Sequence, residues 1–314
     1  MRPLVVGTRG SALALWQARR VAARLQDLHA DLRIEERIVH SEGDLDKTRP
    51  VGIDDRGIYV RSLERALLAA EIDLAVHSLK DLPTDQPAGL TLAAIPERHD
   101  PSDVLVTRAG SRFEELPAGT VIGTGSYRRR AQLLNRRPDL ATRGVRGNVD
   151  TRVGKLAAGE FGALVLARAG LERLRIDRLP FLSLDFDLCL PAAGQGALAV
   201  EIRTGDGRTA ALVGVLEDLS VRAEVTAERA FLRELGGGCL APATAFARVV
   251  RVGELHVRAA VGDADGEVLL RGERRGPFAA AEELGVELAH DLNARGAGEL
   301  LASARVAAAR DGRA

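Results

Sequence analysis

The densest group of side chains that could do chemistry in this sequence is a run of arginines. Within it, Asp139 and Asp150 are the only acidic residues. Guanidinium groups pair with carboxylates and phosphates, so an anionic ligand is one interpretation. A solvated helix face in an arginine-rich protein is the alternative. The run comprises Arg128, Arg129, Arg130, Arg136, Arg137, Arg143, Arg146 and Arg152.

The position of two of these arginines favours the anion. Arg128 and Arg129 follow Gly123-Thr124-Gly125-Ser126, which is typical of a turn between a strand and a helix. Free backbone N–H groups at a helix start attract negative charge. Arg9 and Ser11 occupy the same kind of turn near the N-terminus. Neither turn has the glycine spacing of a nucleotide-binding loop, so a ligand with several carboxylates fits equally well.

A lysine and an aspartate end a second strand-like run. Lys80 and Asp81 follow Ile72-Asp73-Leu74-Ala75-Val76, and ligands of open α/β sheets bind at the carboxyl ends of strands. A surface ion pair is the alternative interpretation. Asp81 could transfer protons if its pKa rose from about 3.9, or could stabilise a cation without any shift. Both side chains reach one cleft only if the chain turns there, because neighbours on a strand point to opposite faces.

The two cysteines have different surroundings. Cys239 follows three glycines, which predicts an exposed thiol, whereas Cys189 lies in Leu188-Cys189-Leu190-Pro191 and is expected to be buried. Neither cysteine has the spacing of a metal site, and the sequence contains no serine nucleophile elbow. We therefore expect no metal and find no support for a zinc enzyme or a serine hydrolase.

The elements that must position these residues follow an α/β pattern. Strand-like residues 4–6 precede Ser11, a plausible N-cap, and a helix with an apolar face of Leu15, Ala18, Ala22 and Leu25. A helix over 62–71 and a strand over 72–76 follow. To about residue 92 this predicts a largely parallel sheet.

Two further segments follow a proline-rich linker. Residues 96–101 contain two prolines and predict a domain boundary. Strands over 104–106, 120–123 and 162–166 then repeat the α/β pattern around the arginine-rich helix. After about residue 220 we predict a helix over 223–235 and strands around Phe246, 255–260 and 268–271. A hairpin turn over 262–266 joins the last two strands. Helices over 279–293 and 298–310 complete a small α+β domain.

Composition excludes several classes of protein. The 314 residues carry 44 basic and 44 acidic side chains, which argues against a general nucleic-acid binder. Aromatic residues make up 3% and none lies among the arginines to stack bases. The longest apolar run, residues 12–16, is far below the ~18 residues of a membrane span. No signal peptide is evident at the start, so we expect a soluble, cytoplasmic protein.

Six ordered motifs are spread over nearly the whole chain. They lie at residues 8–17 (Thr-Arg-Gly-Ser to Leu-Trp-Gln), 75–83 (Ala-Val-His-Ser-Leu-Lys-Asp-Leu-Pro), 123–129 (Gly-Thr-Gly-Ser-Tyr-Arg-Arg), 146–152 (Arg-Gly-Asn-Val-Asp-Thr-Arg), 191–196 (Pro-Ala-Ala-Gly-Gln-Gly) and 228–239 (Glu-Arg to Gly-Gly-Cys). Together, and at this spacing, they resemble the porphobilinogen deaminase (hydroxymethylbilane synthase) family.

The resemblance implies a fold of two periplasmic-binding-protein-like α/β lobes joined by hinge crossovers, with a small C-terminal α+β domain. The expected bounds are 1–96 with 197–215 for lobe 1, 102–190 for lobe 2 and 219–314 for the C-terminal domain. It also implies a monomer. The return of the chain to lobe 1 after Gln195 comes from the resemblance and not from the sequence pattern.

The resemblance further implies the stepwise condensation of four porphobilinogen molecules with loss of ammonia, followed by hydrolytic release of hydroxymethylbilane. A dipyrromethane cofactor is attached through a thioether to the cysteine that matches Cys239, and Asp81 matches the catalytic aspartate. Residues 51–57 resemble a lid, in which Gly52, Asp54 and Asp55 depart from the usual pattern. Arg56 and Tyr59 belong to this lid. The residues matching cofactor- and substrate-binding positions are Arg9, Ser11, Lys80, Thr124, Ser126, Arg128, Arg129, Arg146, Arg152 and Gln195.

Two alternatives stay open at this point. One is a non-catalytic two-lobed protein that binds a polycarboxylate, against which Cys239, Asp81 and the missing export signal argue. The other is an arginine-rich RNA- or DNA-binding protein, whose affinity would fall steeply with added salt.

Overall fold

The computed structural model describes residues 2–40, 60–236 and 241–311. It divides into two compact units, Met1–His99 with Ala197–Arg222 and Asp100–Gly196 with Ala223–Ala314. Each unit contains a five-stranded mixed sheet, and the second also contains a three-stranded sheet. The expected fold class, two α/β lobes with a small C-terminal domain, is confirmed. The bounds given above for the three domains stay a prediction.

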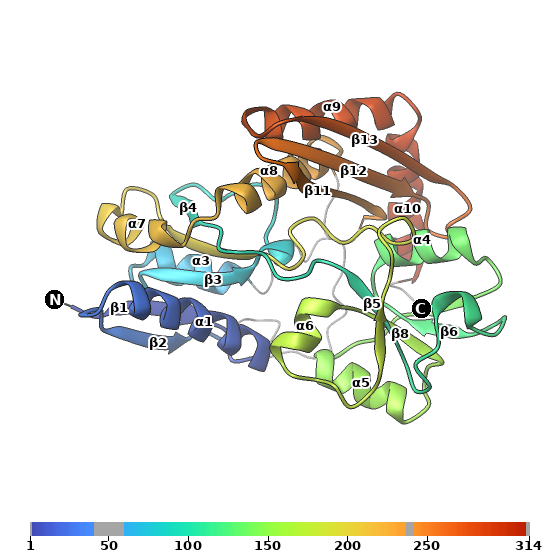
Figure 1. The fold of residues 1–314 in the computed structure, drawn as a ribbon, viewed down its shortest axis with the longest axis horizontal. Helices are drawn as coiled ribbons and strands as arrows, with labels where there is room; N and C mark the ends of the chain where they lie inside the picture. Colours follow the sequence, from blue (N-terminus) through green and yellow to red (C-terminus); the bar gives the residue numbers. More distant parts are fainter. Residues whose placement is uncertain (1, 41–59, 237–240, 312–314) are drawn as a thin grey trace. The chain divides into compact units, whose positions relative to one another are not determined.

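The sheet of the first unit has the strand order β2-β1-β3-β10-β4. Strand β1 is parallel to β2 and β3, whereas β10 is antiparallel to both β3 and β4. Figure 1 shows β1, β2 and β3 side by side in blue and cyan. The largely parallel sheet expected from the first 92 residues is therefore mixed, because a strand from beyond residue 197 inserts into it. The strands are β1 (Leu4–Thr8), β2 (Ile34–Ile38), β3 (Leu74–Ser78), β4 (Leu90–Ala94) and β10 (Leu198–Arg203).

Helices lie on the two chain segments where the sequence predicted them, after Ser11 and over 62–71, whereas the helical residues 79–81 and 207–216 were not predicted. Residues 96–101, where a linker was expected, contain no helix or strand. The helices are α1 (Ala12–Leu28), α3 (Arg61–Leu68), η1 (Leu79–Asp81), α7 (Gly207–Val213) and η3 (Gly214–Leu216).

Helix α1 starts as predicted but buries a different stripe. Ser11 is its N-cap and accepts a hydrogen bond from the backbone N–H of Ala14 at 3.3 Å. The expected apolar face was wrong in part, because Leu15 and Ala22 are only partly buried. Burial centres instead on Ala18, Val21 and Leu25, which pack against β1 and β3, and it includes a glutamine. That glutamine, Gln17, donates its amide to Ser78 Oγ at 2.7 Å, which offsets the cost of its burial.

The sheet of the second unit repeats the topology of the first, with the order β7-β6-β8-β5-β9. Strand β6 is parallel to β7 and β8, and β5 is antiparallel to β8 and β9. In both sheets the antiparallel strand is the one that follows a crossing of the chain between units. The elements are β5 (Asp103–Thr107), η2 (Phe113–Glu115), β6 (Val121–Gly123), α4 (Tyr127–Arg136), β7 (Ala141–Arg143), α5 (Val149–Ala157), β8 (Ala163–Ala167), α6 (Arg168–Arg173) and β9 (Phe181–Ser183).

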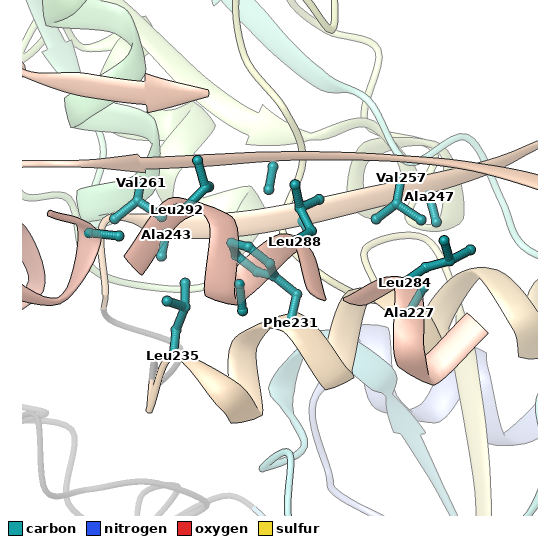
Figure 2. Packing of buried hydrophobic residues seen from close by; sticks show 14 of the residues in the cluster. Ala227, Phe231, Leu235, Ala243, Ala247, Val257, Val261, Leu284, Leu288 and Leu292 are labelled. Atoms are coloured by element: carbon teal, nitrogen blue, oxygen red, sulfur yellow. The ribbon is translucent and has the colours of Figure 1, made fainter. Parts of the chain in front are cut away.

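The C-terminal part of the second unit is a three-stranded antiparallel sheet, β11-β12-β13, covered by helices. Phe231 of α8 lies at the centre of its apolar core and is fully buried, with Leu288 and Leu292 of α9 beside it (Figure 2). A Cβ at Gly285 would meet the carbonyl oxygen of Ala227 at 2.3 Å, so only glycine allows α8 and α9 to approach so closely. The elements are α8 (Leu219–Glu234), β11 (Ala243–Arg251), β12 (Glu254–Gly262), β13 (Leu269–Pro277), η4 (Phe278–Ala280), α9 (Ala281–Asn293) and α10 (Ala297–Asp311).

A buried glutamate joins this domain to a loop of the second lobe. Glu228 of α8 accepts hydrogen bonds from the backbone N–H of Gly194 at 2.6 Å and of Ala247 at 2.9 Å. The Thr244 hydroxyl donates to the carbonyl oxygen of Pro191 at 2.5 Å. The loop over 191–196, one of the six motifs, is thus tied to both α8 and β11.

Candidate functional site

The first unit gathers four of the expected site residues at one edge of its sheet. Arg9 and Ser11 follow β1, while Lys80 and Asp81 lie in the 3₁₀ turn η1 that follows β3. Strands β1 and β3 are parallel neighbours, so their carboxyl ends meet at the same edge. The chain turns at η1, as required for Lys80 and Asp81 to serve one site. Asp81 is exposed and Lys80 is half-buried.

A buried pair holds the strand that carries this turn. His77 Nε2 lies 3.0 Å from Glu201 Oε2, and the side chains are 4% and 0% exposed. Glu201 is on β10, so the pair links β3 to the strand that arrives after the second crossing. Burial and the charge of Glu201 raise the pKa of the nearby Glu64 on α3. This cluster fixes the end of β3 just before Lys80.

The second unit presents an equivalent turn after β6. The backbone N–H of Thr124 donates to the carbonyl oxygen of Arg143 at 2.9 Å, and the N–H of Ser126 donates to Thr124 Oγ1 at 3.2 Å. Ser126 then caps α4 by accepting from the N–H of Arg129 at 3.4 Å. The predicted turn between a strand and a helix is confirmed here, and the structure adds that Ser126 is the N-cap of the helix.

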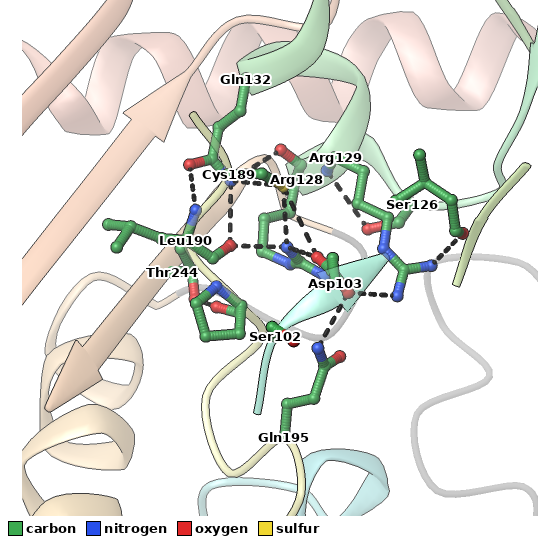
Figure 3. A network of polar contacts seen from close by, with 12 residues as sticks. Ser102, Asp103, Ser126, Arg128, Arg129, Gln132, Cys189, Leu190, Gln195 and Thr244 are labelled. Atoms are coloured by element: carbon green, nitrogen blue, oxygen red, sulfur yellow. Dashed lines mark hydrogen bonds and ion pairs between the residues drawn. The ribbon is translucent and has the colours of Figure 1, made fainter. Parts of the chain in front are cut away.

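Arg128 and Arg129 do not lie on a solvated helix face, so that alternative is wrong for them. Both are buried and both pair with Asp103 at the start of β5 (Figure 3). Arg128 Nη1 donates to Asp103 Oδ2 at 2.7 Å and to the carbonyl oxygen of Leu190 at 2.6 Å. Arg129 Nη2 donates to Asp103 Oδ1 at 2.6 Å, and its Nη1 donates to the carbonyl oxygen of Val165 at 2.9 Å.

The charges of this network explain the ionisation of its aspartate. Burial by itself would raise the pKa of Asp103, but the charges and hydrogen bonds of Arg128 and Arg129 outweigh it and hold that pKa well below its usual range. Asp103 is therefore a carboxylate at neutral pH. Two guanidinium groups and one carboxylate leave the three side chains with a net charge of 2 − 1 = +1.

Polar side chains close the network around Asp103. Gln195 Nε2 donates to Asp103 Oδ1 at 2.8 Å and to the carbonyl oxygen of Pro101 at 2.7 Å. Gln132 accepts from the N–H of Leu190 at 2.8 Å and donates to the Leu190 carbonyl oxygen at 3.1 Å. Gln195, which the resemblance assigned to ligand binding, is thus a buried partner of Asp103 in the structure.

Cys189 is buried within the same network, as its neighbours predicted. Its Sγ lies 3.5 Å from Asp103 Oδ2, and the residue is 0% exposed. Burial, reinforced by the charge of Asp103, raises the pKa of the Cys189 thiol to about 12. Because the thiolate is the nucleophilic form, Cys189 is unsuited to covalent attachment. Cys239, Arg56, Tyr59 and the expected lid over 51–57 lie outside the described residues.

The remaining arginines of the run have separate environments. Arg146 is exposed, whereas Arg152 on α5 is half-buried and donates from Nε to the carbonyl oxygen of Gly147 at 2.8 Å. Arg130 pairs with Asp265 at 2.6 Å, and Arg137 pairs with Asp139 at 2.6 Å. The eight arginines therefore do not form a single anion site.

Two buried charged residues of this unit escaped the sequence analysis. Asp103 lies just before the strand predicted over 104–106 and was assigned no role, although a charged residue next to a buried run is a usable signal. Arg173 on α6 donates from Nη2 to the carbonyl oxygen of Gly196 at 2.7 Å, and burial lowers its pKa to about 10. Nothing in the helical pattern around Arg173 indicates that it is buried.

Known families account for almost all of this chain. Residues 4–211 match the family model "Porphobilinogen deaminase, dipyromethane cofactor binding domain", and residues 222–294 match "Porphobilinogen deaminase, C-terminal domain". The chain belongs to the porphobilinogen deaminase family. Its first matched region is the family's dipyrromethane cofactor binding domain. The resemblance found in the sequence is thereby confirmed.

Individual relatives agree with the family. The chain is 47% identical over 309 residues to porphobilinogen deaminase of Thermus thermophilus, covering 97% of this chain and 100% of that protein. Among solved structures, the effector-binding domain of a BenM variant is 14% identical, with a TM-score of 0.41 over 72% of this chain and 95% of that one. A probable amino-acid ABC transporter extracellular-binding protein, ytmK from Bacillus subtilis, is 8% identical, with a TM-score of 0.42 over 69% and 90%. At this level neither structure bears on function.

The described residues contain neither a metal-binding cluster nor a membrane-spanning helix. No cluster of three or more histidine, cysteine, aspartate or glutamate side chains there could hold a metal ion. Within the same residues, every helix is too short or too polar to cross a membrane.

Proposed function

We propose that the protein condenses four porphobilinogen molecules head to tail, with loss of ammonia at each step, and releases hydroxymethylbilane by hydrolysis. Membership of the porphobilinogen deaminase family is the observation that carries this proposal. Two features of the structure support it. One is the Lys80–Asp81 turn at the carboxyl edge of the first sheet, and the other is the cationic turn after β6 in the second.

The second unit has side chains that suit a dipyrromethane, whose two rings carry acetate and propionate groups. Arg129 is buried, yet its Nε has no hydrogen-bond partner among the described residues. A buried N–H without an acceptor is costly, and a ligand carboxylate is the kind of group that removes this cost. Thr124, Ser126 and Arg128 would join Arg129 in holding the cofactor.

Attachment would occur through a thioether at Cys239. The chain has two cysteines, and Cys189 is excluded by its burial and by a pKa near 12. In the sequence, Cys239 lies between the end of α8 and the start of β11, next to the segments that Glu228 and Thr244 tie to loop 191–196. When bound, the dipyrromethane supplies the terminal pyrrole to which substrate units are joined.

Asp81 would serve the bond-breaking step. The C–N bond of the substrate's aminomethyl group breaks with its electron pair leaving on nitrogen, and positive charge develops on the carbon and pyrrole that remain. A carboxylate close to the pyrrole nitrogen stabilises this charge and can accept the proton released when the new C–C bond forms. Lys80, Arg9 and Ser11 at the same sheet edge, with Arg146 and Arg152 in the second unit, would bind substrate carboxylates. Arg56 and Tyr59 would act from the lid.

The test is the denatured intact mass of the freshly purified protein, with peptide mapping, before and after incubation with porphobilinogen. We expect a two-pyrrole adduct on Cys239 that grows by single pyrrole units. Cys239→Ser should carry no adduct and consume no substrate, whereas Cys189→Ser is the control and should keep its adduct. An unmodified wild-type chain that stays unmodified would favour a non-catalytic polycarboxylate binder instead, and a fully active Cys239→Ser enzyme would overturn the assignment.

We also infer that the protein is a cytoplasmic monomer that uses porphobilinogen as its small-molecule partner and needs neither a metal nor a nucleic acid. Family resemblance and the balanced charge of the chain support this. Light scattering during gel filtration should give a mass near 33.4 kDa. A dimer mass at micromolar concentration would contradict the monomer.

A further inference from the structure

We propose that Asp103 is a positioning residue that orients Arg128 and Arg129 together and makes their pair a receptor for a single ligand carboxylate. This inference rests on the proposed function, because it takes the two arginines to be ligand-binding residues. It assigns a role to a side chain outside the six motifs.

Asp103 contacts both arginines directly. The two carboxylate oxygens are divided between the arginines, Oδ2 accepting from Arg128 and Oδ1 from Arg129. These bonds fix the relative orientation of two side chains that are neighbours on one helix. A fully buried carboxylate cannot move to solvent, so the orientation is maintained before any ligand binds.

The contacts of the two arginines leave some of their N–H groups available to a ligand. Asp103 and the Val165 carbonyl oxygen occupy both Nη atoms of Arg129, and its buried Nε has no partner among the described residues. For Arg128, the hydrogen bonds within the described part of the chain all use Nη1. Each guanidinium carries five N–H donors, so Asp103 takes one edge of each arginine and leaves other donors for a ligand.

Asp103 also sets the net charge of the arginine pair. Two buried arginines without a counter-ion would carry +2, which favours two carboxylates or a dianion such as phosphate. With Asp103 ionised the net charge is +1, and one carboxylate neutralises the site. The buried aspartate therefore sets how many anionic substituents the pair accepts.

The chain supplies a matched control in its other unit. Asp73 is 1% exposed and also bridges two arginines, accepting from Arg2 at 2.5 Å and from Arg203 at 3.3 Å. It lies just before β3, at the amino end of that strand and therefore away from the Lys80–Asp81 edge. Asp73→Asn removes a buried aspartate from an arginine pair without touching the proposed ligand site.

The experiment compares the wild type with Asp103→Asn, Asp103→Glu and Asp73→Asn. For each folded protein, intact mass gives the fraction of chains that carry the two-pyrrole adduct, and initial rates give kcat and KM for porphobilinogen. Circular dichroism and thermal unfolding report the fold separately. Inorganic phosphate is added as a competing dianion.

We expect Asp103→Asn to carry at least tenfold less adduct per folded chain and to be inhibited by phosphate at least tenfold more strongly than the wild type. Asp103→Glu keeps the charge but moves it by one methylene, so it should load the cofactor and show a KM raised about fivefold or more. Asp73→Asn should unfold more easily, yet keep wild-type adduct, KM and phosphate sensitivity.

Three results would overturn the positioning role. In the first, either folded Asp103 variant has wild-type adduct content, KM and phosphate inhibition. In the second, Asp73→Asn loses adduct as much as Asp103→Asn. In the third, neither Asp103 variant folds while Asp73→Asn does, which would make the residue a requirement for folding only. A wild-type chain without adduct or turnover is a different result, because it rejects the proposed function itself.

Discussion

Ser11 and Ser126 cap equivalent helices of the two sheets with the same hydrogen bond. Ser11 Oγ accepts from the N–H three residues later at 3.3 Å, and Ser126 Oγ does so at 3.4 Å. Each caps the helix that follows the strand lying between two parallel neighbours, β1 in one sheet and β6 in the other. Both lobes therefore present a helix N-terminus with a serine at the corresponding sheet edge.

Replacing either capping serine should cost stability whatever its role toward a ligand. We expect Ser11→Ala and Ser126→Ala each to lower the free energy of unfolding by about 1 kcal/mol, because one helix N–H loses its acceptor. Urea unfolding followed by circular dichroism measures the loss. Ser126→Asn is the control, since asparagine caps as well as serine. A stability unchanged by the alanine substitutions would mean that the caps contribute nothing.

Thiol counting should distinguish the two cysteines. In the native protein we expect Cys189 to resist a thiol reagent at pH 8, because it is buried and its pKa is raised to about 12. In denaturant it should react fully. A protein whose Cys239 carries a thioether should therefore yield one reactive thiol when unfolded, and Cys189→Ala should yield none. Two reactive thiols in the unfolded wild type would show that Cys239 is unmodified.

The Cys189 thiol should make the protein less stable at alkaline pH. Its pKa is near 9 in the unfolded chain and about 12 in the folded protein, so the folded state holds the proton more tightly. Its contribution is complete below pH 9 and is lost as the pH rises from 9 toward 12. Between pH 9 and 12, the free energy of unfolding should therefore fall more for the wild type than for Cys189→Ala. A difference independent of pH would contradict the raised pKa.

Asp103 should make the protein less stable at acidic pH. Its pKa is lowered in the folded protein, so its contribution to stability is present above the unfolded pKa of about 3.9 and is lost as the pH falls below it. At pH 7 we expect Asp103→Asn to unfold with about 3–5 kcal/mol less free energy, the usual cost of leaving a buried charge without its partner. Urea unfolding between pH 2.5 and 7 should show the two proteins converging in acid. Parallel curves would argue that Asp103 is not the ionised partner.

Asp81→Ala should separate catalysis from cofactor assembly. We expect the variant to keep its adduct on Cys239 and to lose at least a hundredfold in kcat, because no carboxylate stabilises the charge formed as ammonia leaves. Asp85→Ala removes another exposed carboxylate four residues later and is the matched control. Its kcat should stay within twofold of the wild type. Near-normal turnover of Asp81→Ala would remove Asp81 from the mechanism.

Local signals in the sequence predicted most of the elements. The Ser11 cap and the apolar spacing predicted α1, and the Gly/Ser turn before the arginine run predicted the start of α4. A glycine-bounded turn between two strand-like runs predicted the β12–β13 hairpin. These features depend on residues only a few positions apart, so a short stretch of sequence is enough to predict them. The prediction of which face α1 buries was less accurate, because that face depends on the side chains that the sheet presents to the helix.

Long-range pairings could not be predicted in the same way. The 24 residues between Asp103 and Arg128 contain no pattern that pairs them, and the arginine run offered seven other candidates. The insertion of β10 between β3 and β4 likewise depends on a crossing of the chain that only the family resemblance implied. Sequence reasoning therefore located the candidate ligand-binding side chains but missed the aspartate that orients two of them.

The position of β10 has a consequence for biosynthesis. The first sheet needs β10 between β3 and β4, so it cannot close until the ribosome has translated Arg203, which is 203 − 94 = 109 residues beyond the end of β4. At about 5–20 residues per second this takes roughly 5–22 s. During that interval β3 and β4 have unpaired edges, which are open to mispairing with other nascent chains. A protein with this strand order therefore cannot complete its first sheet until well over half of the chain has been made.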